Sequence, residues 1–101
     1  MKVDILAFGA HPDDVEMGCG GTIAKSTASN KIVGIIDLTK GELGTNGSPE
    51  LRDKEANLAS KIIGAKFRLN LGFPDGFIFN NKENQIEVIK LIRHFMPDII
   101  L

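Results

Sequence analysis

Three ionisable side chains lie close together near the start of the chain: His11, Asp13 and Asp14. Imidazole nitrogens and carboxylate oxygens are ligands that zinc and ferrous iron accept in proteins. His11 and Asp14 are three residues apart, so a tight turn can direct both at one ion while Asp13 faces the neighbouring water as a base. A catalytic zinc takes three protein ligands and lowers the pKa of its water to about 7. The spacing therefore predicts two ligands and a base, and one ligand is missing from this segment.

The same segment also has a plainer interpretation. Proline and aspartate both favour turns, and Asp14 can cap a following helix. On spacing alone, a metal site and a simple turn both remain open.

A glycine-rich stretch at residues 18–21 raises a different function, because dinucleotide-binding folds hold pyrophosphate at a glycine-rich turn after the first strand. The pattern fails in detail, since the sixth position counted from Gly18 is Ile23 and the preceding residues are acidic. We expect these glycines to allow close packing of a helix on the sheet. Cys19 among them is interpreted as a small packing residue rather than a nucleophile.

Two further residues are candidates for substrate contacts. Arg52 follows a long loop at residues 38–47, and its forked guanidinium could bind a substrate carboxylate or lie exposed on the surface. Asp75 lies in a Phe-Pro-Asp-Gly segment, where aspartate serves either a turn or the hydroxyls of a sugar. His94 is expected on the other side of the sheet and is not taken as the third ligand.

The elements that must position these residues follow from hydrophobic periodicity. Apolar runs predict strands at residues 3–8, 32–37 and 66–71, with a fourth beginning at residue 98. A first helix is predicted at residues 20–29. A second is predicted to begin at Pro49, with Ser48 as its cap, and to end at about Ile63. A third is predicted to end near Phe95. The residues expected to face the core are Leu51, Leu58, Ala59 and Ile62 in the second helix, and Ile86, Ile89, Ile92 and Met96 in the third.

Strands and helices alternate along the whole chain, which predicts a doubly wound, Rossmann-like α/β fold with a parallel sheet and helices on both faces. We expect residues 1–101 to form a single domain. Ligands of such sheets bind outside the carboxyl ends of the strands. The loops at residues 9–20, 38–47 and 72–76 should therefore share one edge of the sheet.

Composition excludes several classes of function. The 101 residues are 43% hydrophobic and 25% charged, with a net charge of −1, as in ordinary globular proteins. The basic residues form no stripe and there is no Trp or Tyr, so a nucleic-acid partner is not expected. No run approaches about 20 apolar residues, so no membrane span is expected. A cytoplasmic location is the default, and the single Cys19 suits a reducing compartment.

Four motifs occur in order along the chain. They are Ala10-His11-Pro12-Asp13-Asp14-Val15-Glu16, the segment 37–47, Arg52 with Glu55, and the segment 71–76. Together they resemble the LmbE-like or PIG-L zinc deacetylases, over essentially the whole chain. The resemblance is greatest to the bacillithiol branch, the N-acetylglucosaminyl-L-malate deacetylases.

This resemblance implies zinc-dependent hydrolysis of the acetamide of a small N-acetylglucosaminide. It implies that His11 and Asp14 are zinc ligands and that Asp13 is the general base. It also implies that Arg52 holds the substrate, through the malate carboxylates, and that Asp75 contacts the sugar. Some members of the family are homo-oligomers, so the resemblance leaves assembly of identical subunits open.

The chain departs from the family pattern because it ends at Leu101. Members continue for about as long again, and a histidine after the fourth strand would complete the zinc site. The domain is therefore expected to be incomplete at its C-terminus, and the 101-residue chain by itself is expected to be inactive. Two alternatives remain: a Rossmann-type nucleotide-binding module, and a chain without any catalytic role of its own.

Overall fold

Four parallel strands form one sheet in the computed structural model, which describes residues 1–45 and 47–101. The strands are β1 (Ile5–Gly9), β2 (Val33–Asp37), β3 (Phe67–Asn70) and β4 (Ile99–Ile100), in the order β3-β2-β1-β4. Pairing of β1 with β2 runs from Ile5 opposite Val33 to Gly9 opposite Asp37. The four predicted strands are confirmed, with ends that differ by one or two residues.

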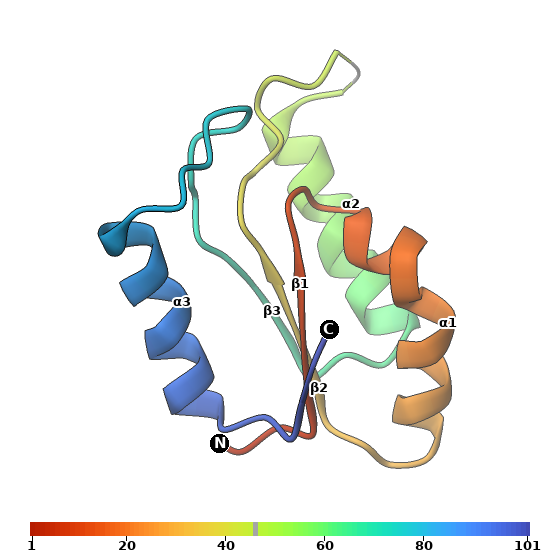
Figure 1. The fold of residues 1–101 in the computed structure, drawn as a ribbon. Coiled ribbons are helices and arrows are strands. Elements are labelled where there is room, and N and C mark those ends of the chain that lie inside the picture. Colours follow the sequence, from red (N-terminus) through yellow and green to blue (C-terminus); the bar gives the residue numbers. More distant parts are fainter. Residues whose placement is uncertain (46) are drawn as a thin grey trace.

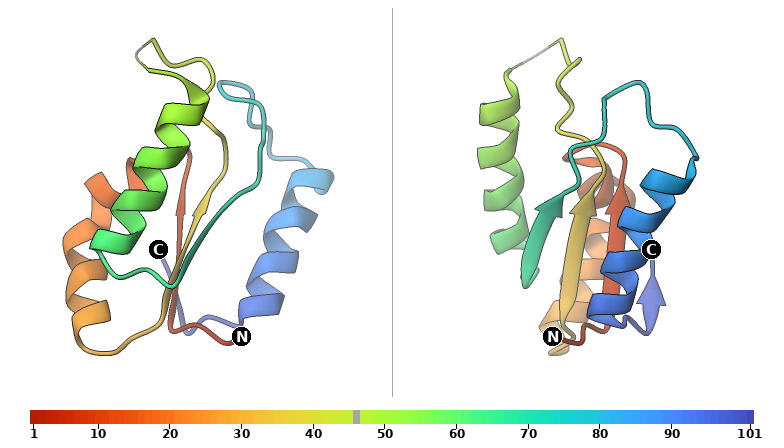
Figure 2. Two further views of the ribbon diagram at one scale, coloured as in Figure 1. Left: turned by 180° about the vertical axis from the view of Figure 1, so that it is seen from behind. Right: turned by 90° about the vertical axis from the view of Figure 1, so that its left-hand side faces the viewer.

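Three helices cover the two faces of this sheet. α1 (Asp14–Ala28) and α2 (Pro49–Ile62) lie on one face and α3 (Lys82–Phe95) lies on the other (Figure 1). The loops that follow β1, β2 and β3 emerge at the same edge, as the side view in Figure 2 shows. The predicted doubly wound α/β fold is confirmed. Because β2 and β3 lie to one side of β1 and β4 lies to the other, the winding reverses at β1, and ligands of such folds bind beside the point of reversal.

Apolar side chains fill the space on both sides of the sheet. The buried cluster that includes α1 contains Ile5, Ala7, Val15, Ile23, Val33 and Ile35, and the cluster that includes α3 contains Val3, Leu6, Ile36 and Phe95. On the α3 side the rings of Phe67 and Phe95 stack with centroids 4.4 Å apart. A Cβ atom on Gly34 would lie 2.1 Å from the Phe67 ring, so only glycine at this position of β2 leaves room for the stack.

The first helix begins six residues earlier than predicted, at Asp14 instead of residue 20. The backbone N–H of Met17 donates to the carbonyl of Asp13, and Val15 in the new first turn is buried against the sheet. The glycine run therefore lies inside a helix, which bends where Cys19 departs from helical angles. Ideal Cβ atoms on Gly18 and Gly21 would meet nothing within 4 Å in the described part of the chain. The prediction that these glycines allow close packing of a helix on the sheet is therefore wrong. Because they lie inside a helix, they also do not form the phosphate-binding turn of a nucleotide site.

The second helix begins as predicted but buries a different face. The Ser48 hydroxyl accepts the N–H of Leu51, and Pro49 is the first helical residue. Leu51, Leu58 and Ile62 are exposed, and the residues that face the sheet are the small Ala56 and Ser60. Small residues are buried here because the helix lies close over the long side chain of Arg68 in β3.

The third helix buries a face that matches the prediction only in part, because Ile92 alone of the four predicted core residues packs against the core. Ile86, Ile89 and Met96 are exposed, whereas Phe95 is buried and Leu91 and Ile92 pack beside it. Met96 lies past the helix end in the left-handed conformation, with φ of 46°.

None of the helices in residues 1–45 and 47–101 is long and apolar enough to cross a membrane.

Candidate active site at the sheet edge

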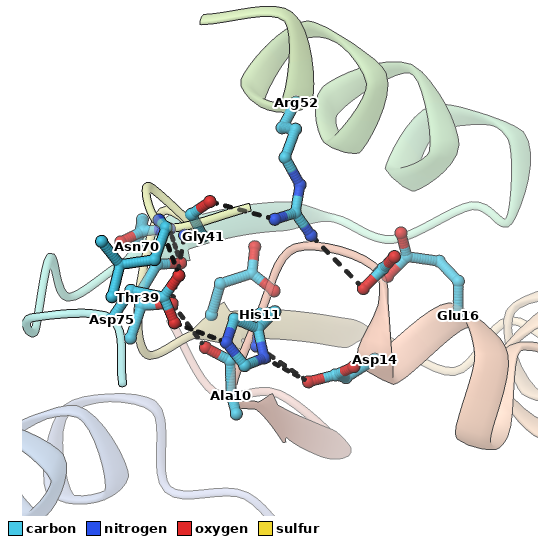
Figure 3. Close-up of polar contacts among 12 residues, drawn as sticks. Ala10, His11, Asp14, Glu16, Thr39, Gly41, Arg52, Asn70 and Asp75 are labelled. Carbon is cyan, nitrogen blue, oxygen red and sulfur yellow. Dashed lines mark hydrogen bonds and ion pairs between the residues drawn. The ribbon is translucent and has the colours of Figure 1, made fainter. Parts of the chain in front are cut away.

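Hydrogen bonds join the three loops at the carboxyl edge of the sheet, as predicted. The Thr39 hydroxyl and N–H both donate to the carbonyl of Ala10, at 2.9 and 3.1 Å. The side-chain amide of Asn70 donates to the Thr39 carbonyl at 2.7 Å, and the N–H of Phe73 donates to the Leu38 carbonyl at 2.8 Å. The loop after β1 is thereby fixed to the loops after β2 and β3 (Figure 3).

His11 and Asp14, the two predicted metal ligands, lie side by side. His11 Nδ1 is 3.3 Å from Asp14 Oδ2, and the His11 backbone N–H donates to the same oxygen at 2.9 Å. Two atoms that are each about 2.0–2.1 Å from a tetrahedral zinc are about 3.3 Å apart, so this nitrogen and oxygen suit one zinc ion. The side chains are 40% and 45% exposed, so solvent would reach an ion held between them.

These two side chains do not make a complete metal centre. Within residues 1–45 and 47–101, no group of three His, Cys, Asp or Glu side chains is placed to hold a metal ion. The donor set here is one imidazole and one carboxylate, whereas a catalytic zinc uses three protein ligands. In the described part of the chain, His11 and Asp14 could therefore provide two ligands to such an ion.

The other ring nitrogen of His11 contacts Asp75, which sequence analysis had assigned to the substrate. His11 Nε2 lies 2.6 Å from Asp75 Oδ1 (Figure 3). The hydrogen bond to Asp75 raises the pKa of His11 above 6.5, against the opposing effect of burial, and the Asp14 contact adds to the rise. The structure therefore places Asp75 behind the histidine, on the side away from Asp14.

Asp75 is held in place from the long loop after β2. Its Oδ2 accepts the N–H of Leu43 at 2.9 Å, and its own N–H donates to Glu42 Oε2 at 2.9 Å. The N–H of Leu43 lowers the pKa of the Asp75 carboxyl below 3.8, and His11 adds to that effect. Gly76 follows at φ of 75°, which closes the turn after Pro74 and is an angle that glycine adopts without strain.

Arg52 lies over Asp13, the predicted base. Arg52 Nη2 is 3.6 Å from Asp13 Oδ1, and Nη1 donates to the carbonyl of Gly41 at 3.2 Å. A Cβ atom on Gly41 would lie 2.0 Å from Nη1, and the φ of Gly41 is 65°. Glycine at this position is thus what allows the guanidinium to reach the sheet edge.

An open cavity of about 370 Å³ lies beside these two residues. Its described lining residues are Asp13, Gly44, Thr45, Gly47, Leu51, Arg52 and Glu55. The volume is in the range of small-molecule sites, and acid and base side chains face it together. The predicted base and the predicted substrate-binding arginine therefore share one cavity.

Sequence analysis missed a buried ionic cluster directly beneath this edge. The Arg68 guanidinium forms a two-pronged contact with Asp37, with Nη2 2.9 Å from Oδ1, and Nη2 also donates to Glu16 at 2.9 Å. Its Nη1 donates to the Ala56 carbonyl and the Ser60 hydroxyl. The Arg68 side chain is only 3% exposed. It ties α1, α2 and β2 to β3, which explains why α2 presents small residues to the sheet.

The charges in this cluster act in opposite directions on its two buried members: burial raises the pKa of Asp37 despite the contact with Arg68, and Glu16 adds to that rise. Burial favours loss of the Arg68 proton, but the hydrogen bonds to Asp37 and Glu16 outweigh it and raise the pKa of Arg68. The signal in the sequence was Asp37, a carboxylate that ends a continuous apolar strand and so needs a buried cation.

Two residues set aside in the sequence analysis lie away from the site. Cys19 packs half-buried against the core on the α1 side, and burial raises the pKa of its thiol. His94 stacks edge-on against Phe95 near the end of α3, which leads into the amino end of β4. The edge that carries His11 is the opposite one.

Comparison with known proteins decides the family. A family model described as "PIG-L: GlcNAc-PI de-N-acetylase" matches residues 6–101. The chain belongs to the PIG-L family. The resemblance expected from the four motifs is confirmed at this level, whereas the matches do not single out its bacillithiol branch.

Relatives of this PIG-L chain include curated proteins and solved structures. The "Uncharacterized deacetylase YaiS" of Escherichia coli is 39% identical over 71 residues, which cover 70% of this chain and 38% of that protein. The diacetylchitobiose deacetylase of Thermococcus kodakarensis is 35% identical over an aligned length of 104 residues. The alignment covers 96% of this chain and 39% of that protein.

Among solved structures, the conserved protein TT1542 from Thermus thermophilus matches with a TM-score of 0.92 and 45% identity. The match covers 97% of this chain and 44% of that one. The chain thus spans less than half the length of each of these three relatives.

Proposed function

We propose that the protein carrying this chain is a zinc-dependent N-deacetylase of N-acetylglucosaminides. The observation that carries the proposal is the 3.3 Å separation of His11 Nδ1 and Asp14 Oδ2, with Asp13 beside them under Arg52. Support comes from the names of the matched family and of the Thermococcus protein, both of which describe removal of acetyl groups from amino sugars.

His11 and Asp14 would hold the zinc, together with a third ligand from outside the described residues. Zinc held there would polarise the acetamide carbonyl and lower the pKa of the attacking water. Asp13 accepts a proton from that water as its oxygen bonds to the carbonyl carbon. The C–N bond then breaks as the amine nitrogen takes up the proton held by Asp13, and acetate and the glucosamine product leave.

Arg52 is the residue we assign to the substrate. Its side chain is 20% exposed and borders the cavity of about 370 Å³. A forked guanidinium pairs well with carboxylates, and N-acetylglucosaminyl-L-malate, the bacillithiol precursor, carries two of them. We therefore propose this compound as the substrate, with diacetylchitobiose, named for the Thermococcus relative, as the neutral competitor.

Acetate release from the two substrates by the purified protein tests the proposal. We expect hydrolysis of the malate glucosaminide that a chelator abolishes and zinc restores, and weaker hydrolysis of diacetylchitobiose. Equal rates on both substrates would remove the assignment of Arg52 to malate. Zinc-independent release, or none from either substrate, would overturn the proposed function.

Activity is proposed only for a polypeptide that supplies the third ligand. The described residues of the 101-residue chain provide two, so the chain by itself should bind zinc weakly and release no acetate. A cytoplasmic location stays a prediction from the sequence, and assembly into homo-oligomers stays a prediction from the resemblance.

A further inference from the structure

Asp75 is buried, and both of its carboxylate oxygens are already engaged. Its side chain is 8% exposed, with Oδ1 2.6 Å from His11 Nε2 and Oδ2 accepting the N–H of Leu43 at 2.9 Å. A sugar hydroxyl would have to compete with both contacts and reach a nearly covered group. The placement therefore argues against sugar binding as the main role of this residue.

We propose that Asp75 is a positioning residue that fixes the ring of His11 as a metal ligand, an inference that rests on the proposed function. An ionised carboxylate accepts hydrogen bonds only, so the nitrogen that faces it must carry the ring proton. Carboxylates face both ring nitrogens, but Asp75 lies 2.6 Å from Nε2 whereas Asp14 lies 3.3 Å from Nδ1, so the single proton of the neutral ring stays on Nε2 and the lone pair is on Nδ1. Nδ1 is the atom that lies 3.3 Å from Asp14 Oδ2, where the metal would bind.

Metal-ligating histidines commonly donate their second ring N–H to a carboxylate, which fixes the ring and strengthens the ligand. Here the carboxylate comes from a loop 64 residues away, after β3. That loop is clamped in turn by Glu42, which accepts the N–H of Asp75. The loop after β2 therefore determines, through Asp75, which nitrogen His11 offers to the metal.

The contact with Leu43 makes the substitution Asp75→Asn informative. The N–H of Leu43 is a donor, so the amide would turn its oxygen towards Leu43 and its NH2 towards His11. The NH2 group would donate to Nε2 and move the ring proton to Nδ1, where it blocks the metal. A carboxylate-to-amide change behind a catalytic histidine has this effect in serine proteases, where the wrong ring tautomer forms.

The experiment measures zinc affinity and the His11 tautomer in the purified protein. Zinc affinity comes from competition with a chromophoric chelator, and the tautomer comes from nitrogen shifts of the metal-free ring at about pH 8.5, above the ordinary histidine pKa. We expect the Nε2–H tautomer in the wild type, and for Asp75→Asn the Nδ1–H tautomer with zinc affinity reduced about 10–100-fold. Asp98→Asn, which removes a carboxylate paired with Lys2 before β4, is the matched control and should change neither quantity.

Asp75→Ala is the second variant, since it removes both acceptor atoms without adding a donor. Its ring should divide between the tautomers, and zinc affinity should fall less than for Asp75→Asn. Wild-type zinc affinity and the Nε2–H tautomer in both variants, with only KM raised, would overturn the inference in favour of sugar contact. A wild-type protein that binds no zinc would overturn both this inference and the proposed function.

Discussion

His11 Nε2 and Asp75 Oδ1 lie 2.6 Å apart, although 64 residues separate them in the chain. The contact joins the loop after β1 to the loop after β3. It also leaves the second ring nitrogen of His11 facing Asp14. If His11 and Asp14 bind the metal as proposed, both loops are needed to prepare that site.

The metal-free His11–Asp75 pair should give a defined pH dependence. The raised pKa of His11 means that its protonation stabilises the fold fully below pH 6.5, and that this contribution is lost as the pH rises through the folded-state pKa. The lowered pKa of Asp75 means that its contribution is present above pH 3.8 and is lost as the pH falls through its folded-state value. The ion pair thus persists from the folded-state pKa of Asp75, which lies below 3.8, to the folded-state pKa of His11, which lies above 6.5.

Nuclear magnetic resonance titration of the metal-free protein checks this window. The His11 ring should titrate above 6.5, and Asp75→Asn should bring its midpoint down, because the negative charge at 2.6 Å is removed. An unchanged midpoint in that variant would show that Asp75 does not hold the His11 proton in solution.

Replacing the proposed base should separate catalysis from metal binding. Asp13→Asn removes the proton acceptor but leaves His11 and Asp14 in place, so acetate release should fall about 10²–10⁴-fold while the zinc content stays at the wild-type level. Steady-state rates and elemental analysis of the same preparation give both numbers. Wild-type turnover would mean that another residue is the base.

Gly41→Ala should act on the substrate through Arg52. The added Cβ would lie 2.0 Å from Arg52 Nη1 and so displace the guanidinium from the cavity. If Arg52 binds a substrate carboxylate, KM for the malate glucosaminide should rise about 10–100-fold, as expected for loss of a charge-assisted hydrogen bond. Arg52→Ala should give a similar rise.

Gly72→Ala is the control for Gly41→Ala. Gly72 has nearly the same φ, 68°, but a Cβ there would meet nothing within 4 Å in the described residues. It carries the same backbone strain without the clash, so its KM should stay near the wild-type value. Equal KM changes in the two glycine variants would assign the effect to strain rather than to Arg52.

Removal of the buried cation beneath the site should destabilise the fold. Arg68→Met would leave Asp37 and Glu16 without their shared partner, at a cost of about 3–5 kcal/mol in the free energy of unfolding. Arg93→Met, on the exposed surface of α3, should change it by no more than about 0.5 kcal/mol. Urea unfolding of both variants measures these changes in the free energy of unfolding. Similarly small decreases in the two variants would show that the cluster contributes little to stability.

The periodicity of the sequence placed the strands correctly but misjudged the helix faces. Leu58 and Ile62 are exposed because α2 lies over Arg68, which admits only the small Ala56 and Ser60 between helix and sheet. A periodic pattern shows that a helix has an apolar stripe. It does not show which neighbour the helix meets, and here that neighbour is a charged side chain from an edge strand.

The sequence by itself determined the alternation of elements, the parallel α/β fold and the proximity of His11, Asp13 and Asp14. Residues three apart stay close in any turn, so that part of the site is a local property. Only the tertiary structure placed Asp75 behind His11 and Arg52 over Asp13. It alone also placed Arg68 against Asp37 beneath these two pairs. These contacts join residues from different loops and strands, and their distances depend on strand order, pairing register and the packing of each helix on the sheet.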